Sequence, residues 1–286
     1  MRYDSPVFQY IQQKGMIDNY ISYSIYMYIT ARMKLFNSAA LLVQRPGLGF
    51  VASETTWEME YHRHIKPEAK PLLVLKPFAP FDLLYEVGDT YSLDDTPLPP
   101  WMEDSSIVTS AKQQFDIHYE SLVPILRKHG VYYSEKEMGI RRGGSIEYSP
   151  NPLPIIVEKR KQGNIIERTT HYTHYAMIIN EKSDSQSKAM AIFHEIGHLL
   201  CGHLPFDADV HKDKAFDIRI CHRHSEITQE QEEFEAEKVC ELILNSLGYS
   251  YDRHEYLDDF LVDGNEPEYD IGVIASAADE FLEWLK

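Results

Sequence analysis

Apolar residues recur at helical spacing in the first part of the chain. Isoleucines lie four residues apart from Ile17 to Ile29, and this pattern predicts one or two helices within residues 10–43. The pair Pro46–Gly47 ends them. Short apolar runs, each bounded by Pro or Gly, then predict strands at 50–52 and 72–75. This order indicates a small α/β unit.

The second part of the chain combines short apolar segments with long helical patterns. Residues 112–129 are periodic enough for a helix that bends at Pro124. Three segments separated by Gly and Pro predict a small sheet, and they are 145–148, 155–157 and 175–179. Two strong helical patterns and a closing helix at 271–285 follow. We therefore expect an α+β arrangement here.

A stretch rich in Asp, Pro, Ser and Thr separates the two parts, between Tyr91 and Ser106. This composition is typical of a linker or a long surface loop. We therefore predict an N-terminal α/β domain at 1–92, a linker or long loop at 93–106, and an α+β domain at 107–286.

Charge and cysteine content narrow the classes of partner and compartment. The chain has 286 residues, of which 28 are basic and 45 acidic, and its net charge of −17 would repel a nucleic acid if it were evenly spread. Residues 1–82 carry 9 basic and 7 acidic residues, so any nucleic-acid contact belongs to them. Three cysteines are too few for a disulfide framework, and the longest early uncharged run, 19–31, is too short to span a bilayer. We expect reduced thiols, a cytoplasmic location, no signal peptide and no membrane partner.

His194, Glu195 and His198 form an H-E-x-x-H pattern. Positions i and i+4 share one face of a helix, so both imidazoles can reach one zinc ion at about 2.0–2.1 Å. The metal lowers the pKa of a bound water towards roughly 7, and Glu195 can accept its proton as general base. We expect one zinc ion at this pattern. The alternative is a pair of core histidines with ordinary hydrogen-bond partners.

The pattern lies in a predicted amphipathic helix at 185–202. Ser183, Asp184 or Ser185 can cap its start, and Gly202 can end it. Its apolar stripe consists of Ile192, Phe193, Ile196, Leu199 and Leu200. Burying His and Glu side chains beside this stripe is costly unless they have partners, which favours a metal.

A second helix supplies the third ligand in this prediction. Thr228 and Gln231 form a capping box at its start, and Glu233 and Glu237 share a face with Ala236 between them. We expect Glu233 to be the third ligand, because the small Ala236 leaves room for the other helix. Glu237 can accept the free N–H of a ligating imidazole. The alternative is a solvated acidic helix start, which the helix dipole favours.

Other residues of metal-binding type lie nearby. His203 follows Gly202 and should point away from the metal if the helix ends there, so we treat it as non-ligating. Cys221, His222 and His224 are candidates for a second metal site, but their spacing gives no defined geometry, and a surface loop is the favoured interpretation.

Cationic and aromatic residues interleave between positions 57 and 76. Cations can follow a phosphate backbone and an indole can stack on a base. The residues that we select as DNA contacts on this ground are Trp57, Arg63, Lys66 and Lys70. Several glutamates in the same stretch reduce its net positive charge, and the alternative is an ordinary solvated surface.

The two helices together resemble those of the gluzincin-like ImmA/IrrE family of metallopeptidases. Here the family pattern comprises 194–198, then Glu233, Ala236 and Glu237. The first domain resembles that of ArdC-type anti-restriction proteins, in which a domain that binds single-stranded DNA precedes a zinc peptidase-like domain. The residues that carry this second likeness include Phe36, Asn37, Gln44, Arg45, Pro46, Trp57, Ile65, Lys66, Pro67, Lys70 and Pro71.

These resemblances imply a zincin-like fold for 107–286 and a zinc-dependent endopeptidase. Its substrate would be a protein or peptide, such as a regulator encoded by or acting on a mobile element. One alternative is a single-stranded-DNA-binding protein with a structural or vestigial metal site, and another is an interaction module with structural histidines.

Overall fold

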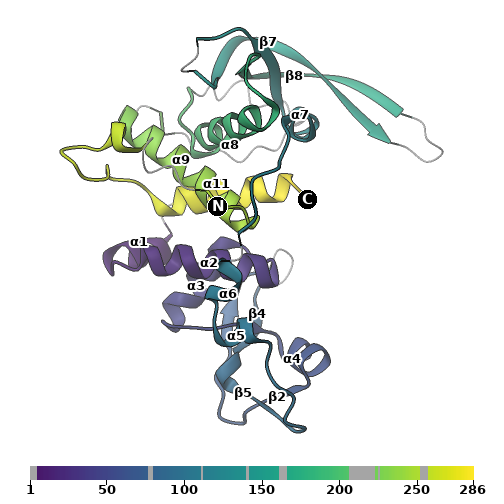
Figure 1. The fold of residues 1–286 in the computed structure, drawn as a ribbon, viewed down its shortest axis with the longest axis vertical. Coiled ribbons are helices and arrows are strands. Elements are labelled where there is room, and N and C mark those ends of the chain that lie inside the picture. The colour runs from purple at the N-terminus through teal and green to yellow at the C-terminus, as the bar shows by residue number, and fades with distance from the viewer. Residues whose placement is uncertain are drawn as a thin grey trace. The chain divides into compact units, whose positions relative to one another are not determined.

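The computed structural model describes residues 5–76, 80–110, 112–139, 142–160, 166–205, 223–224, 226–251 and 257–286. Contacts within the chain divide it into two units. The first comprises Met1–Gln113 and Leu244–Tyr251, and the second comprises Gln114–Ile243 and Asp252–Lys286. Helices and small sheets occur in both units, so the expectation of a mixed α+β fold is confirmed (Figure 1). No helix of the described residues is long and apolar enough to cross a membrane.

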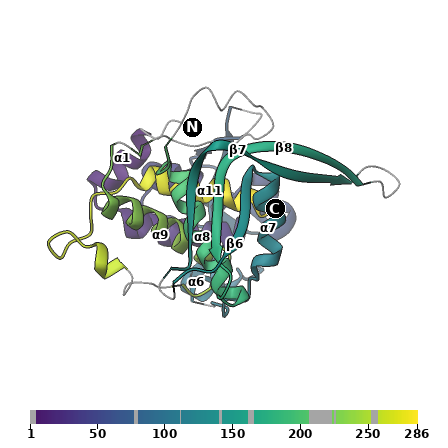
Figure 2. The same cartoon turned by 90° about the horizontal axis from the view of Figure 1, so that it is seen from above.

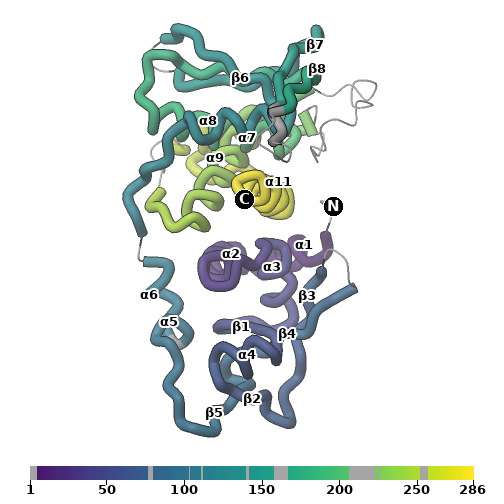
Figure 3. The backbone as a smooth tube through the Cα atoms, turned by 90° about the vertical axis from the view of Figure 1, so that its right-hand side faces the viewer, coloured from purple at the N-terminus to yellow at the C-terminus, as the bar shows by residue number. Residues whose placement is uncertain are grey.

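Three helices open the first unit, where the apolar pattern predicts one or two. They are α1 (Pro6–Gln13), α2 (Ile17–Ala31) and α3 (Leu35–Gln44). Arg32 ends α2 in the left-handed conformation, with φ 51°, and the chain turns into α3. Helix α3 packs against both α1 and α2 (Figure 3).

A three-stranded antiparallel sheet follows in the order β1 (Val51–Ala52), β4 (Asp82–Glu86) and β3 (Leu72–Val74). Side-chain amides of α3 cover the outer edge of β3. Gln44 donates to the carbonyl of Leu73 and accepts from its N–H, both at 2.8 Å. Asn37 makes the same pair of bonds with Leu75, at 3.1 and 3.2 Å. Asn37 and Gln44, two of the residues on which the resemblance to ArdC-type proteins is based, therefore satisfy backbone hydrogen-bonding groups at this edge of the sheet.

The other elements of the first unit are α4 (Glu54–Tyr61), β2 (Arg63–Ile65), the 3-10 turn η1 (Val87–Asp89), β5 (Thr90–Ser92), α5 (Pro100–Glu103) and α6 (Ser106–Thr109). Strands β2 and β5 pair antiparallel. The segment 93–106 is grouped with the first unit and contains α5.

The second unit places one long helix against a three-stranded sheet. Its elements are α7 (Tyr119–Lys128), β6 (Val131–Lys136), β7 (Gly144–Arg160), β8 (Ile166–Asn180), α8 (Ser185–Cys201), α9 (Gln229–Ser246, whose last three residues count with the first unit), η3 (Asp258–Phe260) and α11 (Ile271–Trp284). The strand order is β6-β8-β7, with β6 parallel and β7 antiparallel to β8. Helix α8 packs against β7, β8, α7 and α11 (Figure 2).

Two boundaries differ from the sequence prediction. The segments 145–148 and 155–157 are parts of one strand, β7, with a register shift between Tyr148 and Leu153. An edge strand tolerates the intervening prolines because its outer N–H groups have no strand partner to lose. The helix expected at 112–129 begins only at Tyr119, because Gln113 is held extended by backbone hydrogen bonds to residues 248 and 250.

Candidate metal centre

Helix α8 displays the H-E-x-x-H residues on a firmly capped element. The carboxylate of Asp184 accepts from the N–H of Ser187 at 2.9 Å, and Gly202 ends the helix with φ 79°. The whole predicted apolar stripe from Ile192 to Leu200 is buried. The core thus holds the helix through its apolar stripe. His194 and His198 lie together at the cleft described below.

Helix α9 approaches α8 at the smallest residues of both. A Cβ on Gly197 would lie 2.7 Å from the carbonyl oxygen of Ala236 and 2.8 Å from its Cα. These are backbone atoms and not the end of a flexible side chain, so any larger residue at position 197 would force the two helices apart. The capping box at the start of α9 is formed, because Thr228 and Gln231 exchange backbone-to-side-chain hydrogen bonds. The close approach brings the first turns of α9 beside His194 and His198.

The side chains of His194, His198 and Glu233 converge on one point. The two Nε2 atoms lie 3.1 Å apart, and Glu233 Oε2 lies 3.3 Å from Nε2 of His194 and 3.6 Å from Nε2 of His198. Ligand atoms about 2.1 Å from a tetrahedral zinc ion are about 3.4 Å from one another. The separations of 3.1 and 3.3 Å are slightly shorter than that value, and the separation of 3.6 Å is slightly longer. The group is therefore able to hold a metal ion.

The electrostatics of the group favour a positive charge at its centre. Burial opposes protonation of His194, but hydrogen bonds to Glu233 and Glu237 outweigh it and raise the pKa of His194 to about 9. Burial likewise opposes ionisation of Glu233, and the two imidazoles outweigh it and hold the pKa of Glu233 well below its usual range. Carboxylates that stabilise an imidazolium would also stabilise a divalent cation.

Glu195 is almost fully buried beside the metal-binding group. Burial raises its pKa, although the neighbouring His198 and His194 act in the opposite direction. A carboxylate with a raised pKa is a better proton acceptor than an exposed one. The position of Glu195 and its environment suit a general base.

Glu237 lies behind His194, where the sequence predicts a hydrogen-bond partner. Its Oε2 is 2.9 Å from Nδ1 of His194, and the side chain is buried. A carboxylate there fixes the proton on Nδ1 and leaves Nε2 free for a metal.

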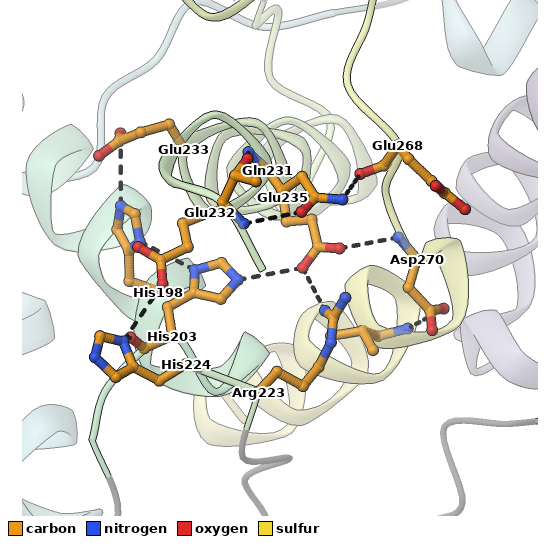
Figure 4. A network of polar contacts seen from close by, with 12 residues as sticks. His198, His203, Arg223, His224, Gln231, Glu232, Glu233, Glu235, Glu268 and Asp270 are labelled. Atoms are coloured by element: carbon orange, nitrogen blue, oxygen red, sulfur yellow. Dashed lines mark hydrogen bonds and ion pairs between the residues drawn. The ribbon is translucent and has the colours of Figure 1, made fainter. Parts of the chain in front are cut away.

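A set of residues that sequence reasoning missed lies behind His198. Nδ1 of His203 is 3.0 Å from Nδ1 of His198, and Nε2 of His203 is 3.2 Å from Glu235 (Figure 4). Glu235 is fully buried and accepts from Arg223 at 2.6 Å. Burial lowers the pKa of His203 to about 4. His203 is thus outside the three-ligand group, yet it contacts one of its members.

The metal-binding group opens on a cleft of about 930 Å³ in the second unit. One wall is the beginning of β7 and the residues before it, 142–148, and the floor is α8. Glu232 and Glu233 of α9 also line it, as does His224, whose Nδ1 is 2.7 Å from the carbonyl of His203. Cys221 and His222, the other two residues considered for a second metal site with His224, lie outside the described residues.

The four residues selected as DNA contacts have mostly structural partners. Trp57 is fully buried and donates its indole N–H to the backbone of β4 at 2.9 Å, so its ring has no exposed face for a base. Arg63 and Lys66 each donate to the segment 87–90 at 2.7 Å. Lys70 is exposed. Single-stranded DNA binding stays a prediction, and Trp57 is corrected to a core residue.

No family model, curated protein or solved structure matches this chain. The chain combines a mixed α+β fold with a partly buried group of His and Glu residues that can hold a metal ion.

Proposed function

We propose that the chain is a zinc-dependent endopeptidase of the ImmA/IrrE type, with a zincin-like second unit. The observation that carries the proposal is the set of distances among His194, His198 and Glu233, which match three corners of a zinc tetrahedron. An open cleft leaves the fourth position accessible. Three protein ligands with one open position are typical of catalytic zinc.

Each residue of the group has a defined part in this chemistry. His194 and His198 would hold zinc through Nε2, and Glu233 would hold it through a carboxylate oxygen. Bound zinc supplies a water of lowered pKa and polarises the peptide carbonyl. Glu195 accepts a proton from the water as its oxygen adds to the carbonyl carbon, and returns that proton to the amine as the C–N bond breaks.

The cleft favours a protein or peptide substrate. Strand β7 is at the edge of its sheet, and its first residues form a wall of the cleft. An edge strand can pair with an extended peptide through backbone hydrogen bonds. The likeness to proteins of mobile elements makes a regulator encoded by or acting on such an element the substrate that we would test first.

The test compares the full-length chain with its Glu195→Gln variant. Both are loaded with zinc, the metal is quantified by elemental analysis, and both are incubated with a library of denatured protein fragments whose new amino termini are read by mass spectrometry. The expected result is cleavage by the wild type and none by Glu195→Gln at equal zinc content. Glu181→Gln, at an exposed turn before α8, is the matched control and should cleave normally.

Two results would contradict the proposal. One is a zinc-loaded wild type that produces no new amino termini, and the other is cleavage that survives in Glu195→Gln. Loss of zinc and activity together in this variant would contradict the assigned roles, because Glu195 would then be needed for binding the metal.

A further inference from the structure

A second group of metal-binding residue types lies directly behind His198. Cys201, His203 and Glu235 are all buried, and one ligand atom from each lies within 4.8 Å of the others. The place of a cation is already taken, because Arg223 Nη1 lies 2.6 Å from Glu235 Oε2. A divalent ion here would face a guanidinium in a poorly solvated interior, where charge repulsion is strong. This group therefore has another use.

The hydrogen bonds of the group fix the position of each proton. Glu235 is ionised beside Arg223 and can only accept hydrogen bonds. The Nε2 atom of His203 that faces it therefore carries a hydrogen. Arg223 already balances the charge of Glu235, so the ring of His203 needs no second proton. Its Nδ1 is then an acceptor and takes the N–H of His198 Nδ1 at 3.0 Å. His198 is left with a lone pair on Nε2, the atom that faces His194 and Glu233.

The surrounding backbone holds this chain of contacts in place. The N–H of Arg223 donates to the carbonyl of Gly202 at 3.0 Å, which sets residues 223 and 203 side by side. The second oxygen of Glu235 accepts from the N–H of Asp270 at 2.9 Å, so neither oxygen of this buried carboxylate lacks a donor (Figure 4). Charged groups this well satisfied restrain the rotation of His203.

We propose that His203 is a positioning residue of the metal centre, which, together with Glu235 and Arg223, holds His198 in its metal-binding tautomer. The two ligand rings are then oriented by different means. A carboxylate, Glu237, acts on His194, whereas a neutral imidazole acts on His198. The inference rests on the proposed function only in that it requires a metal at the three-ligand group.

The experiment measures zinc affinity in His203→Leu, His203→Asn and Cys201→Ala. Affinity is obtained by competition with a chromophoric chelator, ligand geometry from the visible spectrum of the cobalt-substituted chain, and folding from thermal unfolding of the metal-free proteins. Leu removes the acceptor, whereas the Asn amide oxygen takes the place of Nδ1. Cys201→Ala alters the same buried group but leaves the side chains of His203, Glu235 and Arg223 unchanged.

We expect His203→Leu to lose about 10–100-fold in zinc affinity, as other changes of this kind do. His203→Asn should recover most of that loss and a tetrahedral cobalt spectrum, even if His203→Leu is also less stable. Cys201→Ala should bind one zinc as tightly as wild type. Unchanged affinity in His203→Leu, no recovery in His203→Asn, or a second zinc that Cys201→Ala removes would overturn the inference. Failure of the wild type itself to bind zinc would instead refute the proposed function.

Discussion

The contact between Gly197 and Ala236 sets how close the two metal-binding helices lie, and Gly197→Ala tests it directly. Helix propensity alone predicts that this substitution stabilises α8 by about 1 kcal/mol. The structure predicts the opposite sign. The new Cβ would lie 2.7 Å from the Ala236 carbonyl oxygen, where an ordinary contact needs at least 3.4 Å, so the helices must separate by about 0.7 Å.

The size of both effects follows from this displacement. Overpacking of a core contact costs about 1–3 kcal/mol, which for a unit of this size is a fall in melting temperature of roughly 2–12 °C. Metal sites tolerate departures of only about 0.2 Å from ideal ligand distances. A separation several times larger moves Glu233 away from His194 and His198, and we expect at least a tenfold loss of zinc affinity.

The assay combines thermal unfolding of the metal-free chain with a zinc titration. Gly143→Ala is the matched control, because it makes the same change at a glycine that lines the cleft, where the new Cβ would meet Ala191 at an ordinary 3.5 Å. We expect this control to leave both measurements unchanged. A Gly197→Ala chain with wild-type affinity and an equal or higher melting temperature would refute the role of the helix contact.

Two further predictions concern single side chains. Glu237→Ala removes the acceptor behind His194 and should lower zinc affinity about 10–100-fold in a chelator competition; an unchanged affinity would show that this carboxylate does not orient the ring. Burial lowers the pKa of His129 from 6.5 to about 4 in the folded chain. As the pH falls, the unfolded chain therefore takes up this proton first. The contribution of His129 to the stability of the fold is complete above pH 6.5 and is lost as the pH drops towards 4. His129→Phe keeps the stacking on Trp284 and should lose this part of the pH dependence, measured by urea unfolding at pH 7.5 and 5 in chelator; equal pH dependence in both chains would contradict it.

The helices of the candidate centre could be predicted from the sequence because their signals are local. Spacing gives the shared face of His194 and His198, a capping residue marks the start of α8, and Gly202 marks its end. The small Ala236, which lies within one helical turn of Glu233 and Glu237, likewise indicates that another helix approaches closely there. Each of these inferences needs only neighbours a few residues apart.

The residues behind His198 gave no such signal. Glu235 belongs to a run of glutamates at a helix start, a pattern typical of a solvated surface, and its burial depends on Arg223, which lies twelve residues earlier beyond the end of α8. Trp57 shows the same limit in the first unit, because its burial depends on the later strand β4. Contacts between residues far apart in the sequence, such as an ion pair or an aromatic ring packed on a later strand, leave no periodic pattern in the sequence.

Helix packing and charge at the centre depend on each other. Glu195, Glu233 and Glu237 surround two imidazoles in a largely buried site, and the Arg223 guanidinium is already paired with Glu235. Burying three carboxylates side by side is unfavourable unless positive charge lies between them. Two neutral imidazoles supply none, so the site needs a bound cation, a proton on an imidazole, or a proton on a carboxylate such as Glu195, whose pKa burial raises. The contact at Gly197 forces the carboxylates into this arrangement, which is why an added methyl group there should affect the affinity for the ion as well as the stability of the fold.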